Sequence, residues 1–568
     1  MCRRLRGHRL SYAATNWPRW DHHFLPWDPT LAEQLLRQRQ PTPFRPDWLL
    51  QGLVTLQFSF GQVSAAAQLW LANHCGVAIT DVRALMSFYH FLRESEPPRY
   101  QLYFANNIVE QQNGLEPILN RLRSKLASAD CRLETTSCIG QSDRPLSALV
   151  NGLPVVGINQ DNLDELCQLL NSGVPVGRWP EHWFPPADDL RHAGPMTRYD
   201  YHPGMALRHC QKLSSEAIIG LISQAGLRGL GGAGFPTALK WLGCQHQPAA
   251  TRYLICNADE GEPGTFKDRY YLRQQTDPVI EGMLIAARAI GASQGFIYLR
   301  AEYLYLYHHL QQRLEEWRRQ GYLGRDFDIE VQVGAGAYIC GEESALINSL
   351  AGQRGIPRPK PPFPGERGLF DKPTVVNNVE TFAAVTCIIQ QGPAAFREQG
   401  SDTSPGTRVH SVSGDCPRPG LYELAQGTPL RRLLQLCGGE QAGCVQVGGP
   451  SGALLFPEQF DSTLDFDSPG RGGAIMVFDQ TRSVADIAGN FTRFFRYESC
   501  GFCTPCRAGT VALEHLLKRL QQQPERRLQA MEDIMELSEL MAETSHCGLG
   551  KTAALPARNL ISRWVAHD

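Results

Sequence analysis

The sequence of 568 residues lacks an uninterrupted apolar run of the ~18–20 residues that a membrane-spanning helix needs. Its longest apolar stretch, VSAAAQLWLANHCGVAI, is interrupted by Gln, Asn and His. A charge excess of either sign is also missing, because the formal net charge is −2, so nothing indicates binding to nucleic acid or to a membrane surface. The basic N-terminus, MCRRLRGHRLSYAATNW, has no continuous apolar core and makes a poor secretory signal. We therefore expect a cytoplasmic protein.

The cysteine pattern does not indicate a disulfide framework. The chain has 17 cysteines, an odd number, and they are scattered apart from one group near Cys500. Single cysteines in apolar contexts such as LICNAD and YICGEE are typical of reduced, buried thiols. The sequence contains no internal repeat or low-complexity tract. With 42% hydrophobic and 20% charged residues it reads as a globular protein, and its length alone calls for three or four domains.

Hydrophobic periodicity changes several times along the chain and indicates a multidomain α/β protein. The first part has helical spacing in DWLLQGLVTLQFSFGQVSAAAQLWLANHCG, strand-like alternation in RYQLYFANNI and a Pro-rich linker in VPVGRWPEHWFPPADDLRHAGP. Later segments read as strands in GFIYLRAEYLYLY and FDIEVQVGAGAYICG, and as helices in DPVIEGMLIAARAI and TVALEHLLKRLQQ. We expect a helical domain at residues 1–97, a small α/β domain at 98–180, a linker at 181–200, a larger α/β domain at 201–405, a β-rich domain at 406–478 and a C-terminal helical bundle at 479–568.

One cysteine group has the spacing of a metal or cluster site. The stretch ESCGFCTPCRAGT contains Cys500, Cys503 and Cys506, and three thiolates need a fourth ligand. Cys547 in HCGLGKTA supplies it if two antiparallel helices return the chain, which gives the pattern C-x2-C-x2-C-x40-C. Chained cysteines of this kind are typical of [4Fe–4S] sites, whereas zinc sites usually pair two separate ligand units. We favour the cluster, with zinc or simple packing as the alternatives.

A glycine-rich loop is a candidate phosphate cradle. GLRGLGGAGFPTALKW contains the spacing Gly229-x-Gly231-x-x-Gly234. A dinucleotide fingerprint requires a strand before the first glycine, but the preceding SEAIIGLISQAG reads as a helix, so this is not a standard Rossmann turn. Backbone N–H groups of such a loop can still bind phosphate. A glycine-rich surface loop without a ligand is the alternative.

Acidic residues follow an apolar strand in CNADEGEPGTFKDR. Asp259, Glu260 and Glu262 come directly after that strand, and ligands of open α/β sheets collect at the carboxyl ends of strands. Carboxylates there suit hydrogen bonds to ribose hydroxyls and would repel a 2′-phosphate, which favours NAD over NADP. A solvated acidic loop is the alternative.

The same arrangement recurs later in the chain. GAGAYICGEES places Glu342 and Glu343 at a helix start, where acidic side chains also simply complement the helix dipole. PRPKPPFPGERG offers Lys360 as a phosphate partner and Phe363 as a stacking surface, unless it is an ordinary Pro-rich loop. Together with the cysteine group, these loops indicate a nucleotide site that exchanges electrons with an iron–sulfur cluster.

At this point the sequence resembles a known family. GLRGLGGAGFPTALKW, NADEGEPGTFKDR, GAGAYICGEESALINSLAGQRGIPRPKPPFP, KPTVVNNVETFA and ESCGFCTPCRAG with CGLG resemble the NADH-oxidising, FMN-binding subunit of respiratory complex I, over about residues 195–568. ALMSFYHFL and CIGQSDRPLSALVNG resemble the thioredoxin-like [2Fe–2S] subunit of complex I. The fusion of the two is similar to the diaphorase flavoprotein (alpha) subunit of cytosolic NAD-reducing [NiFe] hydrogenases. It implies a thioredoxin-like domain at 98–180, a Rossmann-like FMN/NAD(H) domain at 201–405, a β-grasp-like (SLBB) domain at 406–478 and a [4Fe–4S] bundle at 479–568.

The resemblance also implies the site residues, position by position. It implies ligands of one [4Fe–4S] cluster at Cys500, Cys503, Cys506 and Cys547. It implies contacts to NAD(H) at Phe235, Glu262, Lys360 and Phe363, with Tyr338 nearby. It implies FMN contacts at Gly229, Gly231, Gly232, Lys240, Asn257, Asp259, Glu260, Gly341, Glu342, Glu343, Asn377 and Asn378. Hydride would pass between nicotinamide and flavin, so no catalytic acid or base is expected from the protein.

Two departures from the family pattern stand out. Leu230 occupies a position where the family usually has arginine, which removes a charge beside the glycine loop. In the thioredoxin-like domain, the four cysteines of a [2Fe–2S] site align with Ala105, Glu110, Cys138 and Ser142, so three of them are missing. We therefore expect no [2Fe–2S] cluster there, and a docking role for that domain.

The resemblance implies an NAD(H)-dependent oxidoreductase (diaphorase) subunit that exchanges single electrons with its cluster. Its expected partners are a small iron–sulfur diaphorase subunit and then the hydrogenase small and large subunits. The alternatives are the equivalent subunit of a NAD-dependent formate dehydrogenase or of complex I, and an electron-inactive scaffold or assembly homologue.

Overall fold

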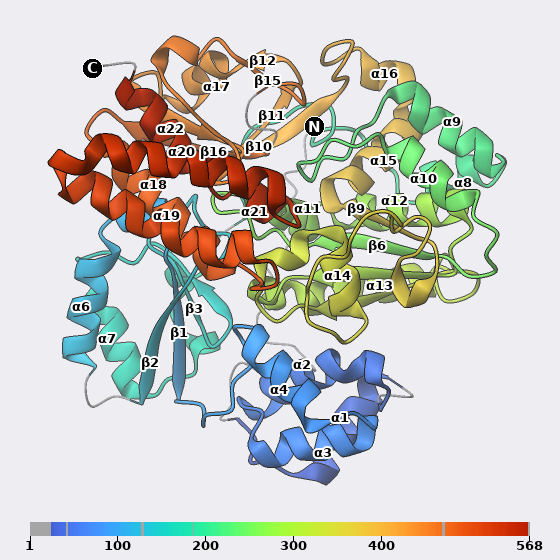
Figure 1. Ribbon diagram of the computed structural model, residues 1–568. Coiled ribbons are helices and arrows are strands. Elements are labelled where there is room, and N and C mark those ends of the chain that lie inside the picture. The colour runs from blue at the N-terminus through green and yellow to red at the C-terminus, as the bar shows by residue number, and fades with distance from the viewer. Residues whose placement is uncertain (1–23, 41–43, 127–129, 186, 469–471, 566–568) are drawn as a thin grey trace.

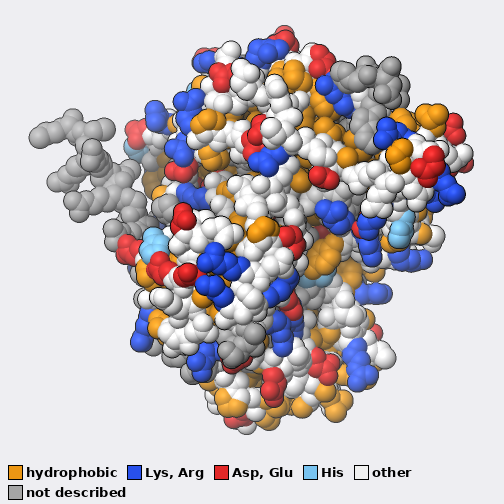
Figure 2. Space-filling view, turned by 90° about the vertical axis from the view of Figure 1, so that its left-hand side faces the viewer, with side chains coloured by type: hydrophobic (Ala, Val, Ile, Leu, Met, Phe, Trp, Pro, Cys, Tyr) orange, Lys and Arg blue, Asp and Glu red, His pale blue; other side chains and the backbone are white. Residues whose placement is uncertain are grey.

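The computed structural model describes residues 24–40, 44–126, 130–185, 187–468 and 472–565 (Figure 1). It is a multidomain α/β protein in which helical domains flank three sheet-containing domains. The basic N-terminal segment considered above as a signal lies outside the described residues. None of the helices described is both long and apolar enough to cross a membrane. On the face shown in Figure 2, Lys and Arg side chains are interspersed with Asp and Glu rather than gathered in a patch of one sign.

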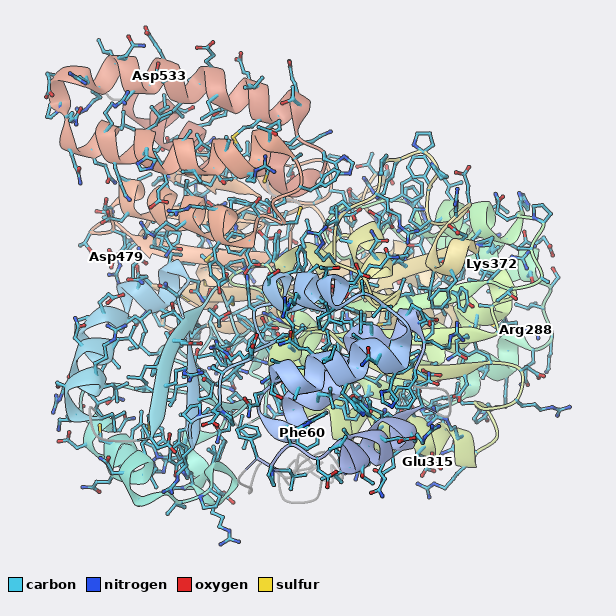
Figure 3. The ribbon with its side chains drawn as sticks, turned by 60° about the horizontal axis from the view of Figure 1, so that its bottom comes forward. Phe60, Arg288, Glu315, Lys372, Asp479 and Asp533 are labelled. Atoms are coloured by element: carbon cyan, nitrogen blue, oxygen red, sulfur yellow. The ribbon has the colours of Figure 1, made fainter. Side chains whose placement is uncertain are left out.

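The N-terminal helices pack against the edge of the larger α/β domain. The buried Gln51 side chain donates to the carbonyl oxygen of Val333 (2.8 Å) and accepts from its N–H (3.3 Å), so it continues the hydrogen bonding of a strand end. Figure 3 shows these helices in blue in front of that domain, with Phe60 labelled. The helices are α1 (Pro29–Arg39), α2 (Leu49–Phe60), α3 (Ala65–Cys75) and α4 (Ile79–Phe88).

The next domain is a four-stranded sheet with the order β2-β1-β3-β4. β1 and β2 are parallel, and the other pairs are antiparallel. Helices α6 and α7 lie beside the sheet (Figure 1). The elements are β1 (Tyr100–Ala105), β2 (Cys131–Thr136), β3 (Ala148–Val150), β4 (Leu153–Val155), α5 (Ile108–Gln112), α6 (Leu115–Lys125) and α7 (Leu163–Ser172).

The larger α/β domain contains a parallel sheet with the order β8-β7-β6-β9. Its strands are β6 (Tyr253–Ala258), β7 (Gln294–Leu299), β8 (Asp328–Val333) and β9 (Thr374–Asn378). Its helices are α8 (Met205–Cys210), α9 (Ser215–Ala225), α10 (Thr237–Gln245), α11 (Lys267–Gln274), α12 (Thr276–Ile290), α13 (Tyr307–Arg319), α14 (Glu343–Leu350), α15 (Val379–Gln391) and α16 (Pro393–Arg397).

The strand order of this sheet creates a switch point. The chain runs outward from β6 through β7 to β8, and then returns to place β9 on the opposite side of β6. Connections therefore diverge at the carboxyl ends of β6 and β9, which is where open α/β sheets bind ligands. Close packing of α12 on α15 supports this edge, because a side chain at Gly282 would collide with the Phe382 carbonyl oxygen.

One strand prediction is wrong in its second half. GFIYLRAEYLYLY was expected to be extended throughout, but β7 ends at Leu299 and a 3-10 helix follows at Ala301–Leu306. Arg300 at this turn is buried, and its guanidinium pairs with Glu302 and donates to the carbonyl oxygens of Cys138 and Glu260. These tertiary contacts, which alternation cannot reveal, favour the turn over a longer strand.

The β-rich domain contains a six-stranded sheet with the order β14-β13-β16-β10-β11-β5 and the small pair β12-β15. β5 comes from the expected linker at 181–200, so that segment contributes a strand to this sheet. The elements are β5 (Leu190–His192), β10 (Thr407–Gly414), β11 (Gly420–Ala425), β12 (Thr428–Pro429), α17 (Leu430–Cys437), β13 (Ala442–Val447), β14 (Ala453–Leu455), β15 (Thr463–Leu464) and β16 (Ala474–Asp479).

The C-terminal part is a helical bundle above the thioredoxin-like sheet (Figure 1). Ser483 caps its first helix by accepting from Asp486 N–H. Its helices are α18 (Val484–Glu498), α19 (Thr504–Gln522), α20 (Arg527–Thr544), α21 (Gly548–Thr552) and α22 (Leu555–Val565).

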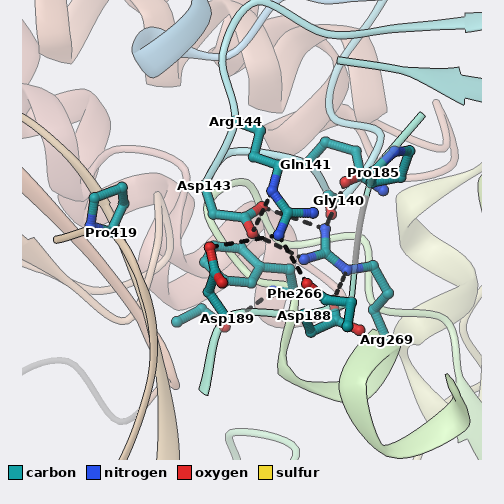
Figure 4. Close-up of polar contacts among 12 residues, drawn as sticks. Gly140, Gln141, Asp143, Arg144, Pro185, Asp188, Asp189, Phe266, Arg269 and Pro419 are labelled. Carbon is teal, nitrogen blue, oxygen red and sulfur yellow. Dashed lines mark hydrogen bonds and ion pairs between the residues drawn. The ribbon is translucent and has the colours of Figure 1, made fainter. Parts of the chain in front are cut away.

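A buried charge network joins the thioredoxin-like domain, the linker and the larger α/β domain (Figure 4). Arg269, at the start of α11, is 1% exposed. Its guanidinium contacts Asp188 of the linker (2.5 Å) and Asp143 of the thioredoxin-like domain (3.0 Å). It also donates to Gln141 and to the Gly140 carbonyl oxygen. Burial alone would raise the pKa of Asp188, but the charges of Arg269 and Arg273 and the hydrogen bonds to Asp188 together lower it.

We expect Arg269→Met to destabilise the protein strongly. The variant removes the closest countercharge of two buried carboxylates, Asp143 and Asp188, which costs roughly 3–5 kcal/mol of unfolding free energy. Thermal unfolding of the full chain should show a markedly lower Tm. Arg431→Met is the matched control, because Arg431 pairs with Asp461 on the exposed surface and should change little. Equal Tm values for the two variants would show that the buried network does not hold the domains together.

Candidate functional site

A cavity of about 650 Å³ lies at the switch point, between the glycine loop and the carboxyl ends of β6 and β9. Most of the residues named from the sequence for the nucleotide site line it. They are Gly229, Gly231, Phe235, Lys240, Asn257, Gly341, Glu342, Glu343, Lys360, Phe363, Asn377 and Asn378. Sequence reasoning missed other lining residues, among them Leu239, Thr374 and Val376, because apolar and small side chains carry no distinctive pattern.

The glycine loop connects α9 to α10 and closes at its base like a hairpin. Gly229 N–H donates to the Phe235 carbonyl oxygen (2.9 Å). Gly232 adopts a φ of +125°, a conformation that residues with side chains rarely adopt. A Cβ at Gly231 would lie 3.0 Å from the Asn378 Cβ, so the loop approaches the end of β9 closely. A helix precedes the loop, as expected, so the cradle differs from a Rossmann turn.

Leu230 is turned away from the cavity. Its side chain is 2% exposed and belongs to the core of the larger domain. Its N–H donates to Thr381 Oγ1 (3.0 Å), and its carbonyl oxygen accepts from the Arg408 guanidinium (2.9 Å). The backbone of the loop is therefore held at this position by α15 and by the β-rich domain, without an arginine side chain.

Two lysines and two glutamates form a paired group on the cavity wall. Lys240 Nζ donates to Glu343 (3.0 Å) and to the Val376 carbonyl oxygen (3.0 Å), and Lys360 Nζ donates to Glu342 (2.8 Å) and Glu343 (2.9 Å). Burial would raise the pKa of Glu343, but the two lysine charges outweigh it and lower that pKa. Glu342 also caps α14 by accepting from backbone N–H groups, so it has the structural role considered as the alternative.

Asp259 is a buried carboxyl without a complete set of partners. Its Oδ2 atom is buried and has no hydrogen-bond partner among the described residues. Burial raises its pKa well above the ordinary value. A Cβ at Gly341 would lie 3.3 Å from the Asp259 carbonyl oxygen, and Asn257 Nδ2 donates to the Gly341 carbonyl oxygen (2.8 Å). An unpartnered polar atom beside two lining residues fits a site that is completed by a polar ligand.

Glu260 does not line the cavity. Its carboxylate accepts from the N–H groups of Asp268 (2.8 Å) and Arg269 (3.3 Å) and from the Tyr303 hydroxyl (2.8 Å). Burial raises its pKa to about 7. The structure thus gives Glu260 the task of holding the start of α11, and the three neighbouring carboxylates do not form one cluster.

Glu262 and Tyr338 also lie outside the cavity wall and contact each other. The Tyr338 hydroxyl donates to Glu262, whose other oxygen accepts from Ser451 N–H (3.0 Å). Ser451 comes from the β-rich domain, and a Cβ at the neighbouring Gly449 would collide with the Glu262 side chain. Sequence reasoning missed Ser451, although the glycines of VGGPSGA were available as an indication of a close approach.

Two exposed aromatic side chains lie at the mouth of the cavity. Phe235 is 51% exposed and Phe363 is 55% exposed, although both line the cavity. Exposed aromatic rings beside a polar cavity suit the stacking of a planar ring. Glycine amides, paired lysines, an unpartnered carboxyl and these rings together fit a phosphate-bearing ligand with a flat ring system.

The four cysteines lie together at one end of the helical bundle. Cys503 precedes α19, Cys506 lies in its first turn, and Cys547 precedes α21 after α20 has returned the chain. A Cβ at Gly550 would lie 2.9 Å from the Cys506 Cβ, so the two segments touch. Burial and the nearby cysteines raise the pKa of Cys506 to about 11, although Ser499 opposes the shift. Within the described residues, no three His, Cys, Asp or Glu side chains converge closely enough to hold a single metal ion.

The four positions aligned with a [2Fe–2S] site contain ordinary buried residues. Ala105 ends β1, and the Glu110 carboxyl accepts from Ser147 N–H (3.1 Å) and Oγ (2.8 Å). Burial raises the pKa of Glu110 to about 8. The Cys138 thiol lies 3.8 Å from Ser142 Oγ and accepts from a backbone N–H.

Three protein families match successive parts of the chain. The family described as "Nuo51 FMN-binding domain" matches residues 222–387, and "NADH-ubiquinone oxidoreductase-F iron-sulfur binding region" matches 486–567. "Thioredoxin-like [2Fe-2S] ferredoxin" matches 34–171, so the N-terminal helices and the following sheet match as one unit. That description is at odds with the expectation that residues 98–180 hold no [2Fe–2S] cluster.

Individual relatives match over most of the chain. The alpha subunit of the NAD-reducing hydrogenase HoxS of Cupriavidus necator is 36% identical, and the match covers 91% of this chain and 90% of the relative. A subunit of the NADH-quinone oxidoreductase of Mycobacterium bovis is 41% identical over 65% of this chain and 89% of its own. A chain of a NAD+-reducing [NiFe]-hydrogenase crystal structure in the H2-reduced state is 38% identical, with a TM-score of 0.86 and coverage of 91% of both chains.

We expect Asp259→Asn and Glu343→Gln to change the stability of the cofactor-free protein in opposite directions. Folding raises the pKa of Asp259. The contribution of this carboxyl to the free energy of unfolding is therefore most favourable below about pH 4 and is lost as the pH rises. Asp259→Asn should therefore gain about 1 kcal/mol or more of unfolding free energy at pH 7. The pKa of Glu343 is lowered, so its contribution is present above about pH 4.3, and Glu343→Gln should lose roughly 1–3 kcal/mol. Urea unfolding between pH 4 and pH 8 measures both, and a loss of stability in Asp259→Asn would contradict the unpartnered state of that carboxyl.

Proposed function

Because this chain belongs to the family of the alpha subunit of NAD-reducing hydrogenase, we propose that it is the diaphorase subunit of such an enzyme. It exchanges hydride between NAD(H) and FMN, and single electrons with one [4Fe–4S] cluster. Its proposed partners are a small iron–sulfur subunit and the small and large hydrogenase subunits. The observation that carries the proposal is that one chain combines the switch-point cavity with a group of four cysteines.

The cavity-lining residues hold FMN and NAD(H) in this proposal. The glycine loop presents N–H groups to the FMN phosphate. Asn257 lines the flavin side of the cavity, and Asp259 lies behind it beside Gly341. Phe235 and Phe363 provide the stacking surfaces for NAD(H), which binds on the exposed side of the cavity. Glu260 acts indirectly, because its oxygens are occupied by backbone N–H groups and Tyr303.

The protein's own contribution to the reaction is orientation. Bound FMN would supply the chemistry that accepts two electrons as hydride and passes them on one at a time. The paired Lys240 and Lys360 keep positive charge near the phosphates while Glu342 and Glu343 hold those ammonium groups in place. Cys500, Cys503, Cys506 and Cys547 are the proposed cluster ligands.

We also propose that the thioredoxin-like domain holds no [2Fe–2S] cluster, despite the name of the family that matches it. Three of the four aligned positions are Ala105, Glu110 and Ser142, which do not provide the thiolates such a cluster needs. The Glu110 carboxyl is already satisfied by Ser147 within the domain.

The equivalent subunit of complex I, or of a NAD-dependent formate dehydrogenase, is the second candidate. The complex I relative matches only 65% of this chain, whereas the hydrogenase relative matches 91%, including the N-terminal domains. That difference favours the hydrogenase assignment.

Iron content separates the two cysteine sites. We expect the reconstituted wild-type chain to bind about four iron atoms and Cys138→Ser to bind the same amount, because the other aligned positions provide no thiols to join Cys138. Cys547→Ser should lose most of the iron but still bind FMN. Iron and sulfide analysis with EPR spectroscopy measures this. A [2Fe–2S] signal that disappears in Cys138→Ser would overturn the proposed absence.

Coenzyme selectivity tests the nucleotide site. We expect anaerobic viologen reduction by the chain loaded with FMN and iron–sulfide to be at least ~10-fold faster with NADH than with NADPH, because carboxylates beside the cavity repel a 2′-phosphate. Equal rates would contradict the proposed discrimination against a 2′-phosphate. No turnover with either coenzyme, despite bound FMN and iron, would favour the electron-inactive scaffold.

A further inference from the structure

Three domains meet at a single carboxylate, that of Glu498 in the C-terminal bundle. This residue is 8% exposed and lies two positions before Cys500. Its Oε1 accepts from the Ser137 hydroxyl of the thioredoxin-like domain (2.5 Å). Its Oε2 accepts from Tyr338 N–H in the larger α/β domain (3.0 Å). The hydroxyl of the same tyrosine contacts Ser451 of the β-rich domain (3.2 Å).

The two loops joined by Glu498 are those that carry the two cofactor sites. Tyr338 lies three positions before Gly341, which lines the nucleotide cavity. Its ring also packs edge-on against Phe494 of α18, with the centroids 4.9 Å apart. The Glu498 carboxylate and this ring contact therefore hold the segment that leads to the cavity against the segment that leads to the four cysteines.

The thioredoxin-like domain contacts Glu498 through a segment next to Cys138, the one cysteine found among the four positions aligned with a [2Fe–2S] site. Ser137 donates to Glu498, and the carbonyl oxygen of the adjacent Cys138 accepts from Arg300 (2.6 Å). Arg300 donates in turn to the carbonyl oxygen of Glu260, next to Asp259 at the nucleotide cavity. The segment 137–138 thus contacts the segment that leads to the four cysteines directly, and the segment of Asp259 and Glu260 through Arg300.

The helical domain secures the same loop from another side. Phe91 N–H donates to the Ala335 carbonyl oxygen (3.0 Å), and His90 N–H donates to the Gly336 carbonyl oxygen (3.1 Å). A Cβ at Gly336 would collide with the Phe91 ring. These contacts fix the N-terminal side of the loop that contains Tyr338. The position of Tyr338 relative to Cys500 then depends on Glu498.

We propose that Ser137, acting through Glu498, is a positioning residue for electron transfer between the nucleotide cavity and the four-cysteine site. The inference rests on the proposed function. Electron transfer rates fall steeply with separation, so a carboxylate that fixes one loop against the other sets the rate between them. The thioredoxin-like domain would then act on electron transfer through a hydrogen bond rather than through a cluster.

The test compares Ser137→Ala with a matched serine. Ser147→Ala removes a similar serine-to-glutamate hydrogen bond inside the same domain, to Glu110, without a contact to Glu498. Ser137→Thr retains the hydroxyl and should behave as wild type. All variants are made in the full chain, and Glu498→Gln serves as the second variant, because it keeps the side-chain shape but removes the charge.

Two measurements are made on each variant. In the cofactor-free chain, amide hydrogen exchange at Tyr338 should accelerate about three- to tenfold in Ser137→Ala and by at least as much in Glu498→Gln. In the loaded chain, stopped-flow absorbance and freeze-quench EPR separate flavin reduction by NADH from cluster reduction. We expect flavin reduction to stay within about twofold of wild type and cluster reduction to slow at least about threefold.

Two results would overturn the inference, and a third would contradict the proposed function instead. The same effects in Ser147→Ala would show that general loosening of the domain is responsible and would overturn the inference. Unchanged exchange and unchanged cluster reduction in both Ser137→Ala and Glu498→Gln would also overturn it. A wild-type chain that binds FMN and iron but is not reduced by NADH would instead contradict the proposed function, independently of Ser137.

Discussion

The divergence of the chain at the carboxyl ends of β6 and β9 is the constraint on which the site depends. The strand order β8-β7-β6-β9 directs the connections away from this edge, so the glycine loop, Asn257 and Asn377 surround a space rather than a core. Once that space exists, the remaining elements close its sides. The Leu230 backbone is held by Thr381 and Arg408, which explains how the loop keeps its shape without the family's arginine.

Buried charges join the outer domains to this centre, in addition to the apolar cores that these domains share with it. Arg269 and Arg300 are both buried and both reach residues of the thioredoxin-like domain. Such groups are costly to bury unless every partner is present, so they specify one relative placement of the domains. The thioredoxin-like domain therefore completes both networks, because removing it would deprive Arg269 of Asp143 and Arg300 of the Cys138 carbonyl oxygen.

The sequence predicted what depends on local pattern and spacing. The helical hairpin that returns Cys547 to Cys506, the sheet domain at β1 and the loop after α9 all follow from periodicity and from cysteine or glycine spacing. It could not predict what depends on contacts distant in the chain. Arg300 ends β7 early, Glu260 turns to Asp268 N–H, and Glu498 joins Ser137 to Tyr338 across 361 and 160 positions. Neither propensity nor spacing carries that information.

Two acidic groups at the nucleotide site differ in their partners. Glu343 is paired with lysines, whereas one oxygen of Asp259 has no hydrogen-bond partner among the described residues. Glu343 is stabilised by two lysines, so it holds positive charge in place whether or not a ligand is bound. Asp259 is buried with a free oxygen, which destabilises the protein alone and leaves a polar atom available to a ligand. Sites commonly carry such local costs, which the surrounding fold must offset.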